Sequence, residues 1–397
     1  MYLVRRRLEG FREDTVSALR VAAVIGRDFD LDTVAHCVGK PDLEVLDALE
    51  QPLEAGMINE HQSVVDRYSF SHALVRAALY QSQSRSRRRR THLAVGRALE
   101  RARECHPAEL ANHFWHAREV GGAEPALEHL WQAGQLADAA RAWEDAERSY
   151  QRALAVLELL PTVDASRRGE LELAHGHALE RSGRADAARA AFRLAAATGQ
   201  ANDDPRLLGL AALGYGRAPS STDVADPELL ALLDSALRAI GPDEQALRSR
   251  LLGRQAVERS SEPDGATAAG RLGRQAVELA ERAGDDSVLA VALASLHWTL
   301  ESPDTLQERC RVARASLQLA QGANDLERVL GARIWWIFDL LELGDIPEVL
   351  AQLDAYERLA ESLRHPGDRA YARVIRALLA LLGGDLGAAS GLVTEAH

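Results

Sequence analysis

Cysteine is scarce in this sequence: the 397 residues contain only three. Cys37, Cys105 and Cys310 are far apart and odd in number, so neither a disulfide framework nor a zinc knuckle is expected. This usage is typical of a protein in a reducing cytoplasm. Lysine is scarcer still, because Lys40 is the only one and arginine carries the remaining positive charge.

Long apolar segments are missing as well. The charged N-terminus, Met1 to Arg7, is followed by no apolar h-region and does not have the pattern of a signal peptide. No uninterrupted apolar run is long enough to span a bilayer. The net charge of −12 disfavours broad binding to nucleic acid or anionic membranes. We therefore expect a cytoplasmic protein with no membrane partner.

Aromatic residues make up only 5% of the chain, although hydrophobic residues make up 47%. Ala and Leu supply most of this apolar content, and both are strong helix formers, as are the abundant Arg and Glu. The chain is also too long for one ordinary core. The composition therefore predicts an all-α protein, built as two domains or as an elongated array of helix pairs packed through small side chains.

Motifs of the common catalytic sites are absent. The sequence has no Gly-x4-Gly-Lys-Ser/Thr phosphate loop, no Gly-x-Ser-x-Gly elbow, no His-Glu-x-x-His and no dinucleotide fingerprint. Gly39-Lys40 lacks an upstream strand and is followed by proline. We therefore expect no catalytic residue, no cofactor in this chain and no ATP hydrolysis by the isolated chain.

Residues 1–82 differ from the rest and predict a small winged-helix-like domain. Three helices are expected, followed by two short strands that flank a polar stretch, as a β-hairpin would. Asp30 is a plausible N-cap of the second helix, and Gly56 ends the third as a C′ glycine. The helices are placed at 16–25, from 30 onward and at 43–55, and the strands at 57–59 and 67–70.

Residues 83–120 predict linking helices, and residues 121–397 predict a tetratricopeptide-like α-solenoid without β-sheet. Two segments match each other as hairpins: Gly134…Ala146-x3-Tyr150-x2-Ala153 and Gly176…Ala188-x3-Phe192-x2-Ala195. In each segment, the glycine allows two helices to approach closely. The spacing of the small, aromatic and small residues places all three side chains on one face of the second helix. Their offset is somewhat longer than the ~34 residues of a consensus tetratricopeptide repeat.

Weaker copies at 344–356 and 384–396 keep this register, and the last one breaks off inside a hairpin, so the array is expected to be truncated. Residues 201–228 and 259–266 predict longer loops. Helix-ending Gly or Asn next to helix-starting Asp marks the expected turns at Gly284-Asp285, Asn324-Asp325, Gly344-Asp345, Gly367-Asp368 and Gly384-Asp385.

Cys105, His106, His113 and His116 form the most metal-like cluster. One helix face could present His113 and His116, but zinc would also need Cys105 or His106 to fold back across Pro107. The alternative is a hairpin helix whose histidines lie at the solvent edge. The second interpretation is favoured, so no metal ligand is predicted.

Arg85 and Arg87 to Arg90 form a basic run beside the predicted winged helix. These residues either contact DNA phosphates or form the solvated face of an amphipathic helix. The apolar and acidic residues that follow, Leu93 to Glu100, favour the solvated face.

His297-Trp298 and Trp335-Trp336 form an aromatic patch in the first helices of two hairpins. Such helices often line the concave face of a solenoid, so Trp298, Trp335 and Trp336 are candidates for a partner or ligand groove. Packing between repeats is the alternative. Adjacent tryptophans on one helix cannot both point inward, so Trp335 or Trp336 should be at least partly exposed.

Three stretches near the N-terminus resemble the region after the nucleotide-binding domain in bacterial STAND-type signal-transduction ATPases, which include large LuxR-family transcriptional regulators. They are LRVAAVIGRDFDL (19–31), ALEQPLEAGMI (48–58) and YSFSHALVRAALY (68–80). Members typically run from a P-loop ATPase through a winged helix to tetratricopeptide-like repeats and an output domain. The chain resembles the middle of such a regulator, because no ATPase or LuxR-type helix-turn-helix motif is present and Arg5 falls about where an ATPase domain would end.

The resemblance implies a regulatory module whose repeats sense a protein partner or a small-molecule inducer, and whose winged helix contacts an ATPase domain that binds ATP or ADP with Mg²⁺. It further implies that His72, with Arg76 one turn later, contacts the nucleotide phosphates of a full-length parent. The alternative is that His72 caps its helix or packs beneath the wing.

Two other functions remain as alternatives. A free-standing winged-helix DNA-binding regulator would use residues 43–55 for recognition, but that helix is rich in Asp and Glu and has no Arg or Lys, so direct DNA binding is not expected. A metal-dependent enzyme around His113 and His116 is the less favoured alternative.

Overall fold

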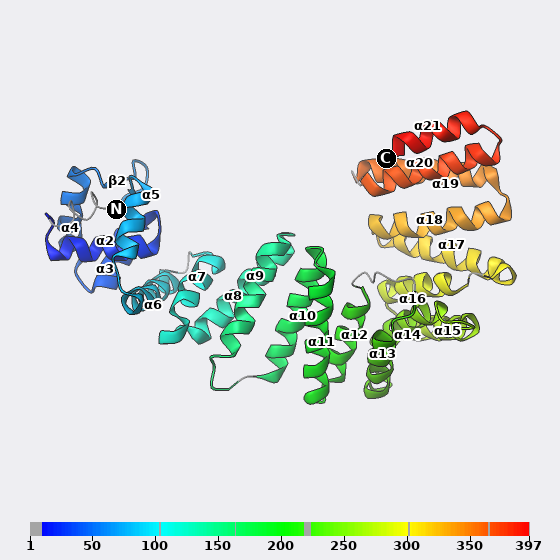
Figure 1. Cartoon of the computed structure of the whole chain (residues 1–397), viewed down its shortest axis with the longest axis horizontal. Helices are drawn as coiled ribbons and strands as arrows, with labels where there is room; N and C mark the ends of the chain where they lie inside the picture. Colours follow the sequence, from blue (N-terminus) through cyan, green and yellow to red (C-terminus); the bar gives the residue numbers. More distant parts are fainter. Residues whose placement is uncertain are drawn as a thin grey trace. The chain divides into compact units, whose positions relative to one another are not determined.

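The N-terminal part of the computed structural model is built around three helices and a small sheet (Figure 1). The structure describes residues 10–102, 105–162, 164–217, 224–300, 302–363 and 366–396. Asp30 caps the second of the three helices by accepting a hydrogen bond from the Thr33 amide at 2.7 Å, as expected. The elements are α2 (Glu13–Ile25), β1 (Asp28–Asp30), α3 (Leu31–Val38), α4 (Asp42–Glu54), β2 (Ile58–Glu60) and β3 (Arg67–Phe70).

The sheet has the order β1-β3-β2, with both pairs antiparallel. Ile58 pairs with Phe70, which confirms the predicted hairpin. The sequence does not predict strand β1, because three residues between two helices are too few to show an alternation of apolar and polar side chains. It forms through pairing with β3, in which Asp28 lies opposite Ser69.

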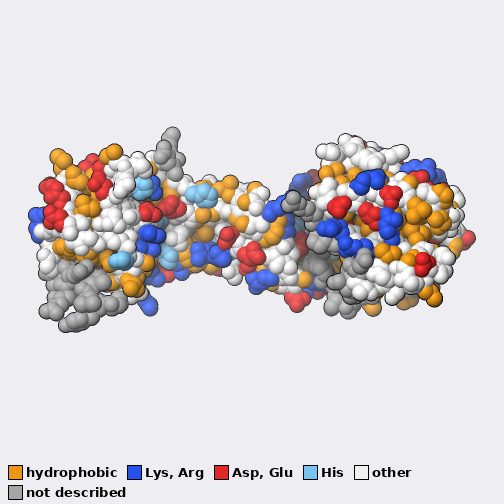
Figure 2. All heavy atoms as spheres, turned by 90° about the horizontal axis from the view of Figure 1, so that it is seen from above, with side chains coloured by type: hydrophobic (Ala, Val, Ile, Leu, Met, Phe, Trp, Pro, Cys, Tyr) orange, Lys and Arg blue, Asp and Glu red, His pale blue; other side chains and the backbone are white. Residues whose placement is uncertain are grey.

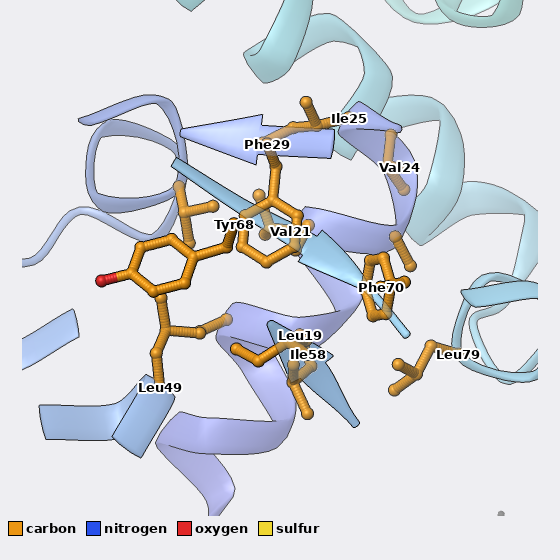
Figure 3. Packing of buried hydrophobic residues seen from close by; sticks show 14 of the residues in the cluster. Leu19, Val21, Val24, Ile25, Phe29, Leu49, Ile58, Tyr68, Phe70 and Leu79 are labelled. Atoms are coloured by element: carbon orange, nitrogen blue, oxygen red, sulfur yellow. The ribbon is translucent and has the colours of Figure 1, made fainter. Parts of the chain in front are cut away.

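The core of this part lies between the sheet and α2 (Figure 3). Leu19, Ile58 and Phe70 are almost completely buried. The Phe29 ring stacks on Tyr68 with a 5.9 Å centroid separation and contacts Phe70 at 5.4 Å. Aromatic side chains contributed by β1 and β3 thus seal the sheet against the helix, and such pairs add to the area they bury.

The chain divides into two compact units, Met1–Thr198 and Gly199–His397. After β3 the first unit is wholly helical in its described residues. Its helices are α5 (Ala73–Gln81), α6 (Arg85–Ala102), α7 (Pro107–Ala117), α8 (Ala123–Ala139), α9 (Trp143–Leu157), α10 (Ala165–Arg181) and α11 (Ala185–Ala201), which spans the boundary; a 3-10 turn covers Arg118–Val120.

Glycines placed under aromatic rings join the hairpins of the first unit. A Cβ on Gly134 would lie 2.4 Å from Tyr150 Cε1, and one on Gly176 would lie 2.7 Å from Phe192 Cε1. This confirms the predicted role of both glycines. A Cβ on Gly96 would likewise lie 2.9 Å from Phe114 Cε1, although the sequence pattern does not predict this hairpin.

The second unit is a succession of helices that pack on their neighbours in chain order. No strand follows Phe70 in the part of the chain that the structure describes, as predicted. The helices are α12 (Pro205–Arg217), α13 (Pro227–Ala239), α14 (Gln245–Ser260), α15 (Ala266–Ala283), α16 (Asp286–Thr299), α17 (Leu306–Gly322), α18 (Leu326–Leu343), α19 (Ile346–Ser362), α20 (Pro366–Leu382) and α21 (Leu386–Ala396), with a 3-10 turn at Pro303–Thr305.

Four of the five predicted turns of this unit are confirmed. The residue before each aspartate has a positive φ, and each aspartate accepts hydrogen bonds from amides of the next helix. The fifth prediction, Gly367-Asp368, is wrong because these residues lie in the first turn of α20. Gly344 and Gly384 are turn residues and do not pack inside a helix as Gly134 does.

The prediction of a long loop over residues 201–228 is also wrong. Helix α12 occupies residues 205 to 217, and Pro205 stands at its first position, where a missing N–H costs nothing. Residues 218–223 lie outside the described ranges. Between α14 and α15 a short connection is present, within the predicted 259–266.

Candidate functional site

An apolar groove of about 430 Å³ opens in the second unit. Helices α14, α16, α17 and α18 line it. The lining combines two tryptophans, Trp298 and Trp335, with small residues such as Ala294, Gly331 and Ala332. We call it the tryptophan groove. Its size and apolar character are those of a small-molecule site.

The two groove tryptophans meet edge to face. Their ring centroids are 5.2 Å apart at an interplanar angle of 89°, and Trp298 is 42% exposed. Trp336 points the other way, into the core of α17–α20, and is only 5% exposed. The expectation that one of two adjacent tryptophans is at least partly exposed therefore holds, because Trp335 is half-buried, whereas Trp336 is buried and does not line the groove.

Gly331 lies in the interior of α18, where glycine is unfavourable by about 0.5–1 kcal/mol relative to alanine. A Cβ at this position would meet no heavy atom within 4 Å. Packing within the chain therefore does not require the glycine. The missing side chain leaves space in the groove next to Trp335.

A buried ionic network lies beneath the groove. Asp339 of α18 accepts hydrogen bonds from His297 Nε2 of α16 at 2.9 Å and from Arg309 Nε of α17 at 2.6 Å. Arg309 also pairs with Glu342 at 2.5 Å. Burial alone would lower the pKa of Arg309, but its hydrogen bonds to Glu342 and Asp339 outweigh burial and raise it. The network ties three groove helices together.

Sequence reasoning missed Arg309 and Asp339 as parts of this site. Asp339 is the only charged residue between Ile334 and Leu341, in an otherwise apolar run. A carboxylate in such a run is very costly to bury unless it is paired, so it indicates a buried partner. The identity of that partner depends on helix packing and has no local signal.

A second cavity of about 480 Å³ continues from the groove and shares Val257, Val291, Ser295 and Arg328 with it. Its lining adds Arg250 and Arg254 and one acidic residue, Asp285. The Asp285 carboxylate is occupied, because it accepts from the Ser287 and Val288 amides. The groove is therefore apolar at the tryptophans and lined by arginines beyond Arg328, where Arg254 pairs with Glu258 and Arg328 with Asp325.

His72 and Arg76, the predicted phosphate contacts, are not brought together in one cavity. His72 is exposed at the start of α5, and its side chain makes no capping hydrogen bond. Arg76 Nε donates to the Ala23 carbonyl at 3.1 Å and so holds the end of α2. Arg76 lines a cavity of about 270 Å³ with His92 and His116, whereas His72 does not.

The residues of the metal-like cluster do not lie together in the structure, and His113 is buried, so the expectation that these histidines lie at the solvent edge is wrong for His113. His113 Nδ1 lies 3.1 Å from Nδ1 of His92, and the His116 ring stacks on His92. His106 caps α7, and the Cys105 thiol faces Glu109. Among the described residues no group of three or more His, Cys, Asp or Glu side chains could hold a metal ion.

The arginines of the basic run have different surroundings and partners. The Arg88 guanidinium lies over the Tyr80 ring at 5.1 Å, and Arg89 pairs with Glu119 at 2.8 Å. Arg87 and Arg90 line a separate cavity with Arg20 of α2. The run is therefore not one continuous basic face.

Helix α4, the candidate recognition helix, presents five exposed carboxylates. Figure 2 shows acidic side chains gathered over the part of the first unit where α4 lies, with charges of both signs elsewhere on that face. Such a surface repels DNA phosphates. None of the described helices is both long and apolar enough to cross a membrane.

Comparison with known proteins leaves the family open. No family model matches the chain, and no curated protein matches it. One similar solved structure is a STAND protein with a tetratricopeptide repeat sensor from Pyrococcus horikoshii; it is 13% identical, covers 100% of this chain and 64% of that chain, and gives a TM-score of 0.43. BtubC (BKLC) from P. vanneervenii is also 13% identical, over 71% of this chain and 93% of that chain, with a TM-score of 0.32. The chain thus spans 64% of the STAND protein, and neither TM-score reaches 0.5, so neither likeness establishes a common fold.

Proposed function

We propose that this chain is a non-enzymatic regulatory module of a STAND-type ATPase or large LuxR-family regulator, and that its repeats take up the signal in the tryptophan groove. The observation that carries the proposal is the groove itself. Trp298 and Trp335 line it edge to face, and Gly331 leaves open space in it.

The signal is a small organic anion with an apolar body. Tryptophan rings favour an aromatic or aliphatic body, and the guanidinium groups of Arg250, Arg254 and Arg328 favour a negative group at the adjoining end. The network of His297, Asp339 and Arg309 holds the groove helices in place. A preformed site of this kind loses little conformational entropy on binding.

The N-terminal part would couple the signal to an ATPase domain. The order of three helices and a β2–β3 hairpin has the layout of a winged helix. The exposed carboxylates of α4 make this part unsuited to DNA, which disfavours a free-standing DNA-binding regulator. The separation of His113 from Cys105 and His106 likewise disfavours a metal-dependent enzyme.

The groove is tested with 1-anilinonaphthalene-8-sulfonate, an anionic apolar dye. We expect Trp298→Ala and Gly331→Leu each to weaken dye binding at least about fivefold, because one removes a contact surface worth ~1 kcal/mol and the other fills the space. Trp143→Ala, in the first unit, is the matched control and should bind like wild type. Fluorescence titration measures all four proteins.

The charge of the ligand is tested with Arg328→Gln. This variant should weaken binding of the anionic dye and leave binding of the neutral N-phenyl-1-naphthylamine unchanged. Equal loss for both dyes would contradict an anionic signal. Unchanged binding in both Trp298→Ala and Gly331→Leu would show that the groove is not the binding site.

A further inference from the structure

A polar cavity of about 510 Å³ lies in the first unit, where α2, α3 and the start of α6 meet. Arg20, Arg87 and Arg90 line it from two helices that are distant in sequence. Ser17, Ser84, Ser86 and Thr91 add hydroxyl groups. Among the described residues no Asp or Glu lines the cavity. In a chain with a net charge of −12, this concentration of positive charge requires an explanation.

The three guanidinium groups form no ion pair with any residue that the structure describes. Other arginines of the unit, such as Arg89, pair with carboxylates. For Arg20, Arg87 and Arg90 the described part of the chain contains no salt bridge, and the Arg20 Nε is buried without a hydrogen-bond acceptor. An anion in the cavity would satisfy these donors, and guanidinium groups match the oxygens of phosphate well.

The start of α6 adds to this preference. The Ser84 hydroxyl accepts a hydrogen bond from the Arg87 amide at 3.2 Å and caps the helix. Helix α6 is 18 residues long, so its N-terminal amides carry a partial positive charge toward the cavity. The helix terminus and the arginines therefore favour the same kind of ligand.

Gln83 indicates a second chemical group on that ligand. Its side chain is only 6% exposed, and its Nε2 donates to the Arg20 carbonyl at 2.9 Å, which fixes the amide orientation. The Oε1 atom is left buried without a donor. A buried acceptor without a partner costs about 1–3 kcal/mol, which a ligand hydroxyl or amino group would recover.

We propose that this cavity binds a small phosphomonoester, whose phosphate contacts Arg20, Arg87 and Arg90 and whose hydroxyl or amino group donates to Gln83 Oε1. The volume fits a metabolite, since small-molecule sites span ~300–1,000 Å³. Duplex DNA is disfavoured because Arg88 and Arg89 of the same run face elsewhere. This site is separate from the tryptophan groove and does not rest on the proposed function.

The test is calorimetric titration of the full chain with glycerol 3-phosphate and with inorganic phosphate. Arg90→Gln should weaken binding of both probes at least about tenfold, because it removes charge-assisted hydrogen bonds. Arg85→Gln removes the same charge from the same run at an exposed position outside the cavity, and should stay within about twofold of wild type.

The hydroxyl contact is tested with Gln83→Leu, with thermal unfolding to verify that the variant folds. It should weaken glycerol 3-phosphate binding and leave inorganic phosphate binding unchanged. The proposal is overturned if neither probe binds at millimolar concentration, if Arg85→Gln weakens binding as much as Arg90→Gln, or if a duplex oligonucleotide binds more tightly than both probes.

Discussion

At the scale of single residues, buried charges have more effect on this protein than exposed ones. Removing one partner of a buried pair typically costs 3–5 kcal/mol, whereas exposed ion pairs contribute ~0–1 kcal/mol. The Arg309–Asp339 pair is buried, while Arg376 with Asp354 is largely exposed. The buried network beneath the tryptophan groove therefore determines how α16, α17 and α18 are held, and the surface pairs do not.

The buried histidine pair restricts protonation in the first unit. Tyr80 Oη lies 3.0 Å from His92 Nε2, and His92 Nδ1 faces His113 Nδ1 at 3.1 Å. The hydrogen bond between the two Nδ1 atoms needs only one proton, which one imidazole donates and the other accepts. If both imidazoles were protonated, two N–H groups would point at each other, so the pair can carry at most one positive charge without moving apart.

This pair predicts a loss of stability in mild acid. Burial, together with nearby His116, Arg88 and Arg76, lowers the pKa of His92 to about 3, and burial lowers that of His113 to about 4. Because both folded-state values lie below the unfolded value of about 6.5, the unfolded chain binds more protons between these limits. Stability should therefore be complete above pH 6.5 and fall as the pH decreases toward 4, by up to ~1.4 kcal/mol per pH unit for each histidine.

Urea unfolding at pH 7.5, 6 and 5 measures this loss. His113→Gln should flatten the pH dependence, since one titrating group is gone. His61→Gln, at an exposed position, is the control and should keep the wild-type slope. Equal slopes for wild type and His113→Gln would contradict the assignment.

At the scale of helices, two glycines with opposite surroundings give opposite predictions. In Gly134→Ala the new Cβ would lie 2.4 Å from Tyr150 Cε1, so α8 and α9 must separate. Such overpacking should cost about 1–3 kcal/mol. In Gly331→Ala the Cβ enters open space, and the higher helix propensity should stabilise α18 by about 0.5–1 kcal/mol.

Thermal unfolding of the two variants checks this pair of predictions. A lower midpoint for Gly134→Ala and a higher one for Gly331→Ala are expected. Each variant serves as the control for the other, because the substitution is identical and only the surroundings differ. If both midpoints rose, helix propensity alone would decide the effect of the substitution. If both fell, packing alone would decide it.

Turns between helices follow local chemistry closely. Asp285 and Asp345 follow a glycine with positive φ and cap the next helix, which is the combination that the sequence predicts. The prediction fails at Gly367 because Pro366 already begins α20. Proline is favoured at the first helical position, and this preference overrides the Gly-Asp signal.

At the scale of the whole molecule, the role of His72 in a full-length parent stays a prediction. His72 is exposed at the N-terminus of α5, where free amides and an imidazole donor suit an anion. We expect His72→Ala in such a parent to weaken ADP retention and raise basal output without loss of folding. Equilibrium ADP binding measures this.

His61→Ala provides the control, because it removes another exposed histidine close to the same sheet. It should retain ADP like the parent. If His72→Ala also retains ADP as tightly as the parent, His72 has no role in nucleotide contact.

The sequence by itself determined most of the helices, the aspartate caps and the hairpins of Gly134 and Gly176, because a cap depends on adjacent residues and each of these hairpins pairs two consecutive helices; it did not predict α12 or the hairpin of Gly96. Gly134 under Tyr150 and Asp30 at the start of α3 are examples. The tertiary structure alone decided that Trp335 and not Trp336 lines the groove, that β1 joins the sheet, and that Arg20 meets Arg87 and Arg90. These outcomes depend on the rotation and register of packed elements, which are set by contacts between residues far apart in the chain and leave no periodic signal in it.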